Sequence, residues 1–253
     1  MLPEVPTTKD SRLPSAAKLP FAGSGLEPGF PDPVRDAQQV FRAALTVMSE
    51  PGKERLLTAG RQIAGLHGAS YALLLALADA DTPVWISPRL DHPALRANLI
   101  FHCNCPITAH RPEAALAVLD GEAAHDTTSL REFSVGDIRR PDRSCTLIVQ
   151  LPRLTGGAPM LWRGPGIPLE HRVFLPLAEA FWQAREKRNA FPLGLDIFFT
   201  AGERLMGLPR TTHTQYSDEY AQVLRRILHR EDDKTAHKAP RTERRRKIPR
   251  EDA

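Results

Sequence analysis

Two strand-like runs near residue 200 constrain the fold more than any other feature of this sequence. Leu195 to Ala201 (LDIFFTA) and Leu205 to Leu208 (LMGL) are apolar, and a short turn at Gly202 and Glu203 separates them. A short turn containing glycine between two such runs is typical of a β-hairpin. Any fold for this chain must therefore include a sheet with at least one antiparallel pair of strands.

The second run leads directly into a polar pentapeptide, Pro209-Arg210-Thr211-Thr212-His213. A guanidinium group offers paired donors and threonine hydroxyls add more, so this cluster is suited to a phosphate-like anion. It can equally be an ordinary exit from a strand. Asp196 begins the first run and lies close to Arg210 if the hairpin pairs in register. The simpler expectation for these two residues is an ion pair.

The first half of the chain is mainly helical. Asp32 can cap a helix whose first residue is Pro33, and Pro51-Gly52 ends it. Its apolar residues recur every three or four positions, which predicts one buried face. These residues are Val34, Ala37, Val40, Phe41, Ala44, Leu45 and Met48. A second helix over about 68–78 is apolar all round and is expected in the core. Asp91 is expected to cap a third over about 93–102.

Strands dominate later in the chain. The expected strands cover 84–87, 107–110, 114–119, 146–151 and 160–163, before the two runs near residue 200. A segment over 121–142 reads as a loop with one helical turn, and further helices are expected over 176–188 and 216–230. The order of elements predicts an α/β fold, a helix–sheet–helix sandwich with a mixed sheet.

Composition excludes several classes of function. The net charge is +4, but residues 217–253 carry 11 Lys and Arg against 8 Asp and Glu, which leaves 23 against 22 elsewhere. The body is therefore nearly neutral and lacks the basic surface of a nucleic-acid-binding protein. The run Arg244 to Lys247 has acidic neighbours and no aromatic residue nearby, so we interpret it as a solubilising tail.

The cysteines and the apolar runs indicate a soluble cytoplasmic protein. Three cysteines do not make a disulfide framework, and they fit a reducing compartment. Residues 1–30 lack the apolar stretch of a signal peptide, and the longest apolar run, Ala69 to Ala78, is about half a membrane span. We therefore expect no membrane association.

Other candidate sites have simpler explanations. His102, Cys103 and Cys105 contain metal-binding groups, but a C-x-C spacing without a second ligand pair predicts a helix end rather than a metal site. The glycines at 156–157 and 164–166 are not followed by a Lys-Ser/Thr pair, so they read as turns. Asp79 and Asp81 lie between a helix and a strand, where turn formation explains them.

Four segments in the same order resemble the PhnH family of carbon–phosphorus (C-P) lyase subunits. They are DPVRDAQQVFRAALTVMSEPG from Asp32, LLLALADADTPVWIS from Leu73, TLIVQLPRLTGGAPMLWRGPG from Thr146 and the FPLGLD and LPRTTH ends of the hairpin segment. The resemblance covers about 30–215. It implies a PhnH-like α/β domain at 30–215. The flanks lie outside it: residues 1–29 are rich in Pro, Ser, Thr and Gly and are expected to form a disordered arm, and 216–253 a short helix with a charged disordered tail.

The resemblance also implies a fold similar to the large domain of pyridoxal-phosphate (PLP)-dependent transferases. PLP chemistry requires a lysine Schiff base. Lys53 and Lys187 are the sole lysines between residues 19 and 233, and neither follows a strand in an apolar pocket. We therefore expect no PLP, no other cofactor and no metal.

The function implied by the resemblance is that of an alkylphosphonate-catabolising complex. Its synthase forms α-D-ribose 1-methylphosphonate 5-triphosphate from ATP and methylphosphonate and releases adenine. The implied partners are PhnG, PhnI and PhnJ, mainly PhnJ, with a homodimer when the subunit is isolated. Sequence reasoning places no nucleophile or base, which favours a structural subunit without independent activity. The alternative is a cleft formed by Arg210, Thr211, Thr212 and Asp196 that binds a phosphonate or triphosphate group and takes part in the transfer.

Overall fold

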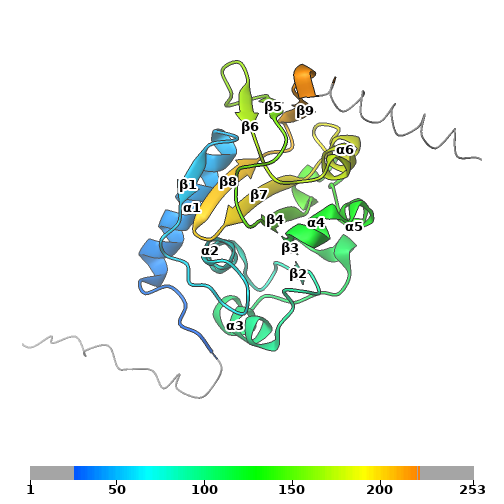
Figure 1. Cartoon of the computed structure of the whole chain (residues 1–253). Helices are drawn as coiled ribbons and strands as arrows, with labels where there is room; N and C mark the ends of the chain where they lie inside the picture. Colours follow the sequence, from blue (N-terminus) through cyan, green and yellow to red (C-terminus); the bar gives the residue numbers. More distant parts are fainter. Residues whose placement is uncertain (1–25, 221, 223–253) are drawn as a thin grey trace, which may run out of the picture.

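The computed structural model describes residues 26–220 and 222 and is built around one six-stranded sheet (Figure 1). The strand order is β1-β8-β7-β4-β3-β2. These strands are β1 (Glu54–Leu56), β2 (Val84–Ile86), β3 (Leu116–Asp120), β4 (Thr146–Gln150), β7 (Asp196–Ala201) and β8 (Arg204–Leu208). Strands β2, β3, β4 and β7 run parallel, whereas β8 and β1 each pair antiparallel with their neighbour. The expected α/β fold with a mixed sheet is confirmed.

The hairpin near residue 200 forms as predicted. Strands β7 and β8 pair from Ile197 opposite Leu208 to Ala201 opposite Arg204. The turn between them contains Gly202 at φ +60°, a backbone conformation that glycine adopts without steric cost. The open end of this hairpin brings Asp196 close to the residues that follow β8.

Helices cover both faces of the sheet (Figure 1). On one side lie α1 (Pro33–Ser49), α2 (Gly68–Leu77) and α3 (Pro93–Cys103), and on the other lie α4 (Gly121–His125), α5 (Thr127–Glu132) and α6 (Glu179–Arg188). Alternation along the strands divides the core accordingly. Val118, Ile148 and Phe198 pack with α1–α3, and Leu119, Val149 and Phe199 pack with α4–α6.

A second sheet of three strands lies beside the first. Its order is β6 (His171–Val173), β5 (Met160–Arg163) and β9 (His213–Tyr216), all antiparallel. Only β5 was expected from the sequence. Strand β9 follows β8 after a turn of four residues, 209–212, so the polar pentapeptide joins the two sheets. A helix was expected over 216–230. Tyr216 is instead the last residue of β9, residues 218–220 and 222 are helical as predicted, and the rest of that span lies outside the described residues.

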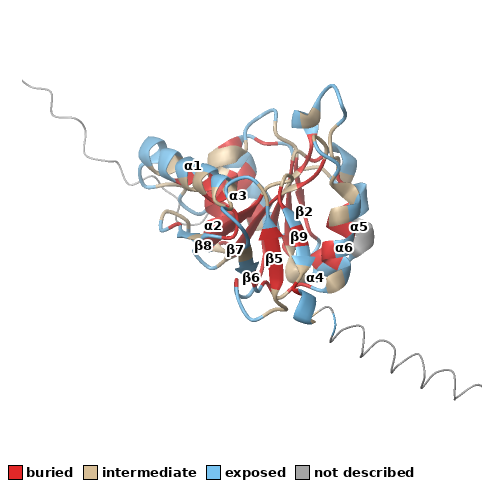
Figure 2. Cartoon of the chain, turned by 90° about the horizontal axis from the view of Figure 1, so that it is seen from above, coloured by how far each residue is buried: buried red, intermediate tan, exposed pale blue. Residues whose placement is uncertain are grey.

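Helix α1 begins as predicted, but its apolar residues divide between two sides. The side chain of Asp32 accepts a hydrogen bond from the N–H of Arg35 at 3.0 Å. Val40, Ala44 and Val47 are buried against α2 and the sheet. The expectation of one buried face is wrong for Val34, Phe41 and Leu45, which are exposed. Figure 2 shows that much of α1 is exposed. One side of a helix on a sheet faces the core, and these three residues project from another side.

Three local expectations also need correction. Asp91 does not cap α3, because its carboxylate pairs with Arg96 and the Nδ1 of His92 accepts the capping bond from Ala94. The strand expected at 107–110 is a single bridge between Ile107 and Val84, since the chain turns into a 3-10 helix (η1, Arg111–Glu113). The loop expected over 121–142 contains α4, α5 and a 3-10 turn (η2, Pro141–Arg143).

Two further expected bounds differ slightly. Helix α2 ends at Leu77 and is buried over 68–74, as its apolar composition predicts. Helix α6 begins at Glu179 rather than at 176, and its N-cap residue Ala178 has an extended backbone.

The first described residues of the chain contact helix α3. Residues 26–29 were assigned to the arm, yet the backbone of Glu27 hydrogen-bonds to Asn98 and His102 of α3. The rest of the arm and most of the tail lie outside the described residues. Within the described part of the chain, no helix has both the length and the apolar content needed to cross a bilayer.

Candidate functional site

The turn Pro209–Thr212 is the candidate site, and Arg210 is its most strongly held residue. The guanidinium Nε–H donates to Asp196 Oδ2 at 3.0 Å, and Nη2 donates to the same oxygen at 2.5 Å. Nη2 also donates to the Ser144 hydroxyl, and Nη1 donates to the carbonyls of Pro141 and Pro192 at 2.8 and 3.3 Å. All five guanidinium N–H groups therefore have partners within the chain.

Asp196 is positioned by the start of β7. Its Oδ1 accepts the backbone N–H of Arg210 at 2.7 Å, in addition to the guanidinium bonds to Oδ2. Both side chains are largely shielded from solvent. The expected ion pair is present, and the hydrogen bonds that neutralise both charges make it a favourable one.

A second arginine, Arg185 of α6, hydrogen-bonds to the backbone of the same turn. Its Nη1 donates to the carbonyl of Thr212 at 3.1 Å, and its Nη2 donates to the carbonyl of Pro209 at 2.8 Å. Burial lowers the pKa of Arg185 to about 10, and the nearby carboxylate of Glu186 opposes that shift. The side chain thus stays charged at neutral pH and satisfies two buried carbonyls.

Sequence reasoning did not identify Arg185, because an arginine on a surface helix is ordinarily solvated. The spacing in the sequence could have indicated it. Arg185 follows Trp182 by three residues and Phe181 by four, so it lies on the same side of the helix as these two buried aromatic residues.

A cavity of about 290 Å³ opens beside this turn. Its lining residues are Pro165, Glu186, Asn189, Phe191, Arg210, Thr211, Thr212 and His213. The side chain of Thr212 is 1% exposed, and its hydroxyl has no hydrogen-bond partner among the described residues. The structure therefore brings together all four residues expected at this site, but the charge of Arg210 is already neutralised by Asp196.

The glycines at 164–166 act in packing. Gly164 has φ +154°, and a Cβ at this position would lie 2.9 Å from the carbonyl oxygen of Thr211. Gly166 has φ +81°, and its Cβ would lie 2.0 Å from the carbonyl oxygen of Ser49. This loop thus contacts both the candidate turn and the end of α1, which agrees with a structural reading of both glycines.

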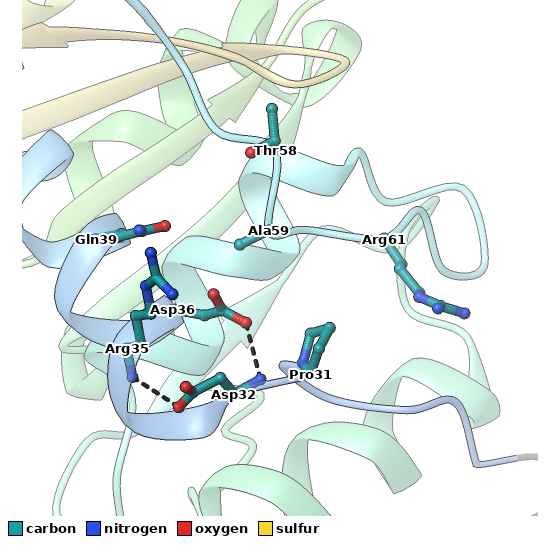
Figure 3. Close-up of a pocket in the computed structure, with 8 residues that line it drawn as sticks. All are labelled: Pro31, Asp32, Arg35, Asp36, Gln39, Thr58, Ala59 and Arg61. Atoms are coloured by element: carbon teal, nitrogen blue, oxygen red, sulfur yellow. Dashed lines mark hydrogen bonds between the residues drawn. The ribbon is translucent and has the colours of Figure 1, made fainter.

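A larger cavity of about 590 Å³ lies at the N-terminus of α1 (Figure 3). The backbone N–H of Asp32 donates to Asp36 Oδ2 at 3.0 Å, which completes the cap of the helix. In Figure 3 the Arg61 side chain points away from these two carboxylates. Helix capping therefore explains the acidic groups of this cavity.

The remaining candidate groups have local roles. Asp79 Oδ1 accepts hydrogen bonds from Thr82 and from the N–H of Asp81, which lower the pKa of its carboxyl, as expected of a turn residue. His102 bonds to Glu27, and Cys103 and Cys105 are buried. Among the residues that the structure describes, no three His, Cys, Asp or Glu side chains gather as metal ligands would.

Comparison with known proteins assigns the family. The sequence profile described as "Bacterial phosphonate metabolism protein (PhnH)" matches residues 28–215. The "Alpha-D-ribose 1-methylphosphonate 5-triphosphate synthase subunit PhnH" of Rhizobium meliloti (strain 1021) is 40% identical over 189 residues, which cover 72% of this chain and 92% of that protein. The "Putative C-P lyase subunit protein HtxG" of Stutzerimonas stutzeri is 30% identical over 182 residues, 70% of this chain and 84% of that protein. This α/β chain belongs to the PhnH family of phosphonate metabolism proteins, as the four collinear segments indicated.

Proposed function

We propose that this chain is a subunit of a C-P lyase core complex in alkylphosphonate catabolism. The complex joins methylphosphonate to C1 of the ribose of ATP and releases adenine, which yields α-D-ribose 1-methylphosphonate 5-triphosphate. The family match over 28–215 and the relative named as a subunit of that synthase support the proposal. The expected partners are PhnG, PhnI and PhnJ, mainly PhnJ, with a homodimer when the subunit is isolated.

The proposed role is structural, without independent activity. The observation that carries it is the full use of Arg210: each guanidinium N–H already has an acceptor inside the protein. A phosphonate could bind this group only by displacing Asp196, the Ser144 hydroxyl or a backbone carbonyl. A buried acceptor that loses its donor costs about 1–3 kcal/mol. Arg210 therefore holds the turn in place.

The alternative is direct binding of a phosphonate or triphosphate group at Arg210, Thr211, Thr212 and Asp196. It is favoured by one observation, the buried Thr212 hydroxyl without a partner beside a cavity of about 290 Å³. A ligand oxygen at this position would satisfy that hydroxyl.

Thr212→Val separates the two roles better than a change at Arg210, because it removes the hydroxyl and retains the shape of the side chain. A structural role predicts unchanged adenine release by the assembled complex. Direct binding predicts a loss of activity of tenfold or more with assembly intact. The control is Thr155→Val. Thr155 is exposed and follows the carboxyl end of β4, whereas the candidate turn lies at the amino ends of the parallel strands.

The subunit assignment itself is tested by omission. The co-expressed complex is assayed for adenine release from ATP and methylphosphonate with and without this chain. Loss of activity that the purified chain restores would support the assignment. Equal activity in both preparations would refute it.

Family membership also supports three expectations about the chain as a whole. The domain at 30–215 would adopt the three-layer fold of the large domain of PLP-dependent transferases, which the helices on both faces of the sheet support. Neither lysine of the described residues fits PLP itself, since Lys53 pairs with Glu50 at the surface and Lys187 is exposed on α6. Three buried cysteines without disulfides fit a cytoplasmic location.

A further inference from the structure

Exposed apolar side chains concentrate on helices α1 and α3. Ten large hydrophobic side chains are exposed among the described residues, and five of them belong to these two helices. They are Val34 (71% exposed), Phe41 (48%), Leu45 (55%), Ile100 (54%) and Phe101 (57%). We call them the α1–α3 surface. Both helices pack on the same face of the six-stranded sheet (Figure 1).

The residues on α1 form a stripe of their own. Val34, Phe41 and Leu45 are separated by seven and four positions, which places them on one side of the helix. The buried residues Val40 and Val47 lie on a different side. Helix α1 is thus apolar on two sides, and burial of one side in the core leaves the other in contact with solvent.

A groove lies beside this stripe, between α1 and α3. A cavity of about 470 Å³ is bordered by Pro33 and Ala37 of α1, by Leu75 of α2 and by Phe101 of α3. The lining is mainly apolar, and Phe30 contributes to it. Phe101 of the α1–α3 surface thus borders this recess directly, and Pro33 and Ala37 border it from α1, next in sequence or one turn from Val34 and Phe41.

The charges beside the stripe indicate what kind of partner fits. Arg35 and Arg42 lie along one side of it, and neither guanidinium group bonds to another residue of the described chain. The acidic residues Asp32 and Asp36 of this helix are occupied in the N-terminal cap. A second copy of α1 would bring more arginines to the same seam, whereas a segment with acidic residues would neutralise them.

We propose that the α1–α3 surface binds an amphipathic helix of another synthase subunit, with an apolar side against Phe41 and Leu45 and acidic residues against Arg35 and Arg42. This inference rests on the proposed function, since it takes the chain to be one subunit of an assembly. It adds the surface that is used and the chemistry of the partner segment.

The test measures binding of the purified full chain to the co-expressed PhnG, PhnI and PhnJ chains. The double variant Phe41→Gln with Leu45→Gln retains helix-forming residues at exposed positions, so the fold should be preserved. We expect its affinity to fall at least tenfold. The matched control is Ile138→Gln with Leu169→Gln, which removes two exposed apolar side chains outside the surface and should bind as the wild type does.

A charge reversal tests the second part of the inference. Arg42→Glu should weaken binding severalfold, and more strongly at low salt, because it places a like charge against the acidic partner. Arg139→Glu, on an exposed loop, is its control. This variant keeps the inference open to refutation if the double variant fails to fold.

The possible outcomes separate the two proposals. If the wild type binds and both surface variants bind equally well, the α1–α3 surface is not the docking site although the subunit assignment stands. If the double variant abolishes self-association of the isolated chain but leaves subunit binding unchanged, the occupant is a second copy and the inference is overturned. If the wild type itself does not bind, the proposed function fails and the inference fails with it.

Discussion

The carboxylate of Asp196 accepts three hydrogen bonds from Arg210, one from its backbone N–H and two from its guanidinium group. Asp196 begins β7 and Arg210 follows β8, so the pair closes the open end of the hairpin, opposite its turn. The same guanidinium reaches Ser144 and the carbonyl of Pro141, which precede β4. One side chain thus ties together three segments that are distant in sequence.

Loss of this arginine should destabilise the fold strongly. Arg210→Ala removes the guanidinium donors from the shielded Asp196 carboxylate and from the carbonyls of Pro141 and Pro192, and leaves the carboxylate with the backbone N–H of residue 210. We therefore expect a loss of about 3 kcal/mol in the free energy of unfolding. Urea denaturation measures it. Arg140→Ala is the control, because Arg140 pairs with Asp142 at the exposed surface and should cost at most about 1 kcal/mol. Equal midpoints for the two variants would contradict the structural role.

Gly166 is expected to tolerate no side chain. Gly166 and Gly65 have nearly the same φ, +81° and +84°, but only Gly166 has backbone atoms where a Cβ would be placed. Gly65→Ala should cost about 1–2 kcal/mol from backbone strain alone. Gly166→Ala should cost clearly more, since Ser49 would have to move. Thermal unfolding of both variants gives the comparison, and similar losses would show that the contact with Ser49 is unimportant.

Tyr71 should make stability depend on alkaline pH. Burial raises the pKa of its phenol, with smaller contributions from Cys103 and Glu27. Above about pH 10 the unfolded chain loses this proton while the folded chain retains it, so stability falls as the pH rises. Tyr71→Phe should reduce this slope by up to about 1.4 kcal/mol per pH unit.

At pH 7 the same variant should be equally stable or slightly more stable, because the buried Tyr71 hydroxyl has no partner among the described residues. Chemical denaturation between pH 7 and 11 tests both statements. Tyr220→Phe, at a less buried ring, is the control. If stability falls with pH as steeply in Tyr71→Phe as in the wild type, the Tyr71 phenol is not the cause of that fall.

The N-cap of α1 should contribute measurably. Asp32→Ala removes the acceptor for the N–H of Arg35 and should cost about 1 kcal/mol. The control is Asp81→Ala. Asp81 contributes its backbone N–H, and not its side chain, to the hydrogen bond with Asp79, so this variant should have a much smaller effect. Urea denaturation measures the loss in the free energy of unfolding for both variants. A loss for Asp32→Ala no greater than that for Asp81→Ala would contradict the capping role of Asp32.

Regular patterns made much of this fold predictable. The hairpin at residue 200, the cap at Asp32 and the buried helix at 68–77 each follow from local sequence, because turn chemistry and apolar spacing act over a few residues. The short strands β1, β6 and β9 escaped prediction, since three or four residues carry little pattern and pairing partners from elsewhere in the chain define them.

The candidate site was only partly predictable, for a related reason. The sequence near the hairpin indicated Arg210 and Asp196 as a pair. It did not indicate Ser144, Pro141 or Arg185, whose contacts with this turn depend on how distant elements pack. The surface residues Val34, Phe41 and Leu45 were predicted to be buried because a helical period reports apolar positions and does not show which side meets the core.

The small sheet affects the order in which the chain can fold during synthesis. Strand β5 is paired on one edge by β6, which follows it closely, and on the other by β9, which ends at Tyr216. While a ribosome is still translating the hairpin, Met160–Arg163 has an unpaired edge. That edge is available to chaperones or to other nascent chains until residues 213–216 have left the exit tunnel.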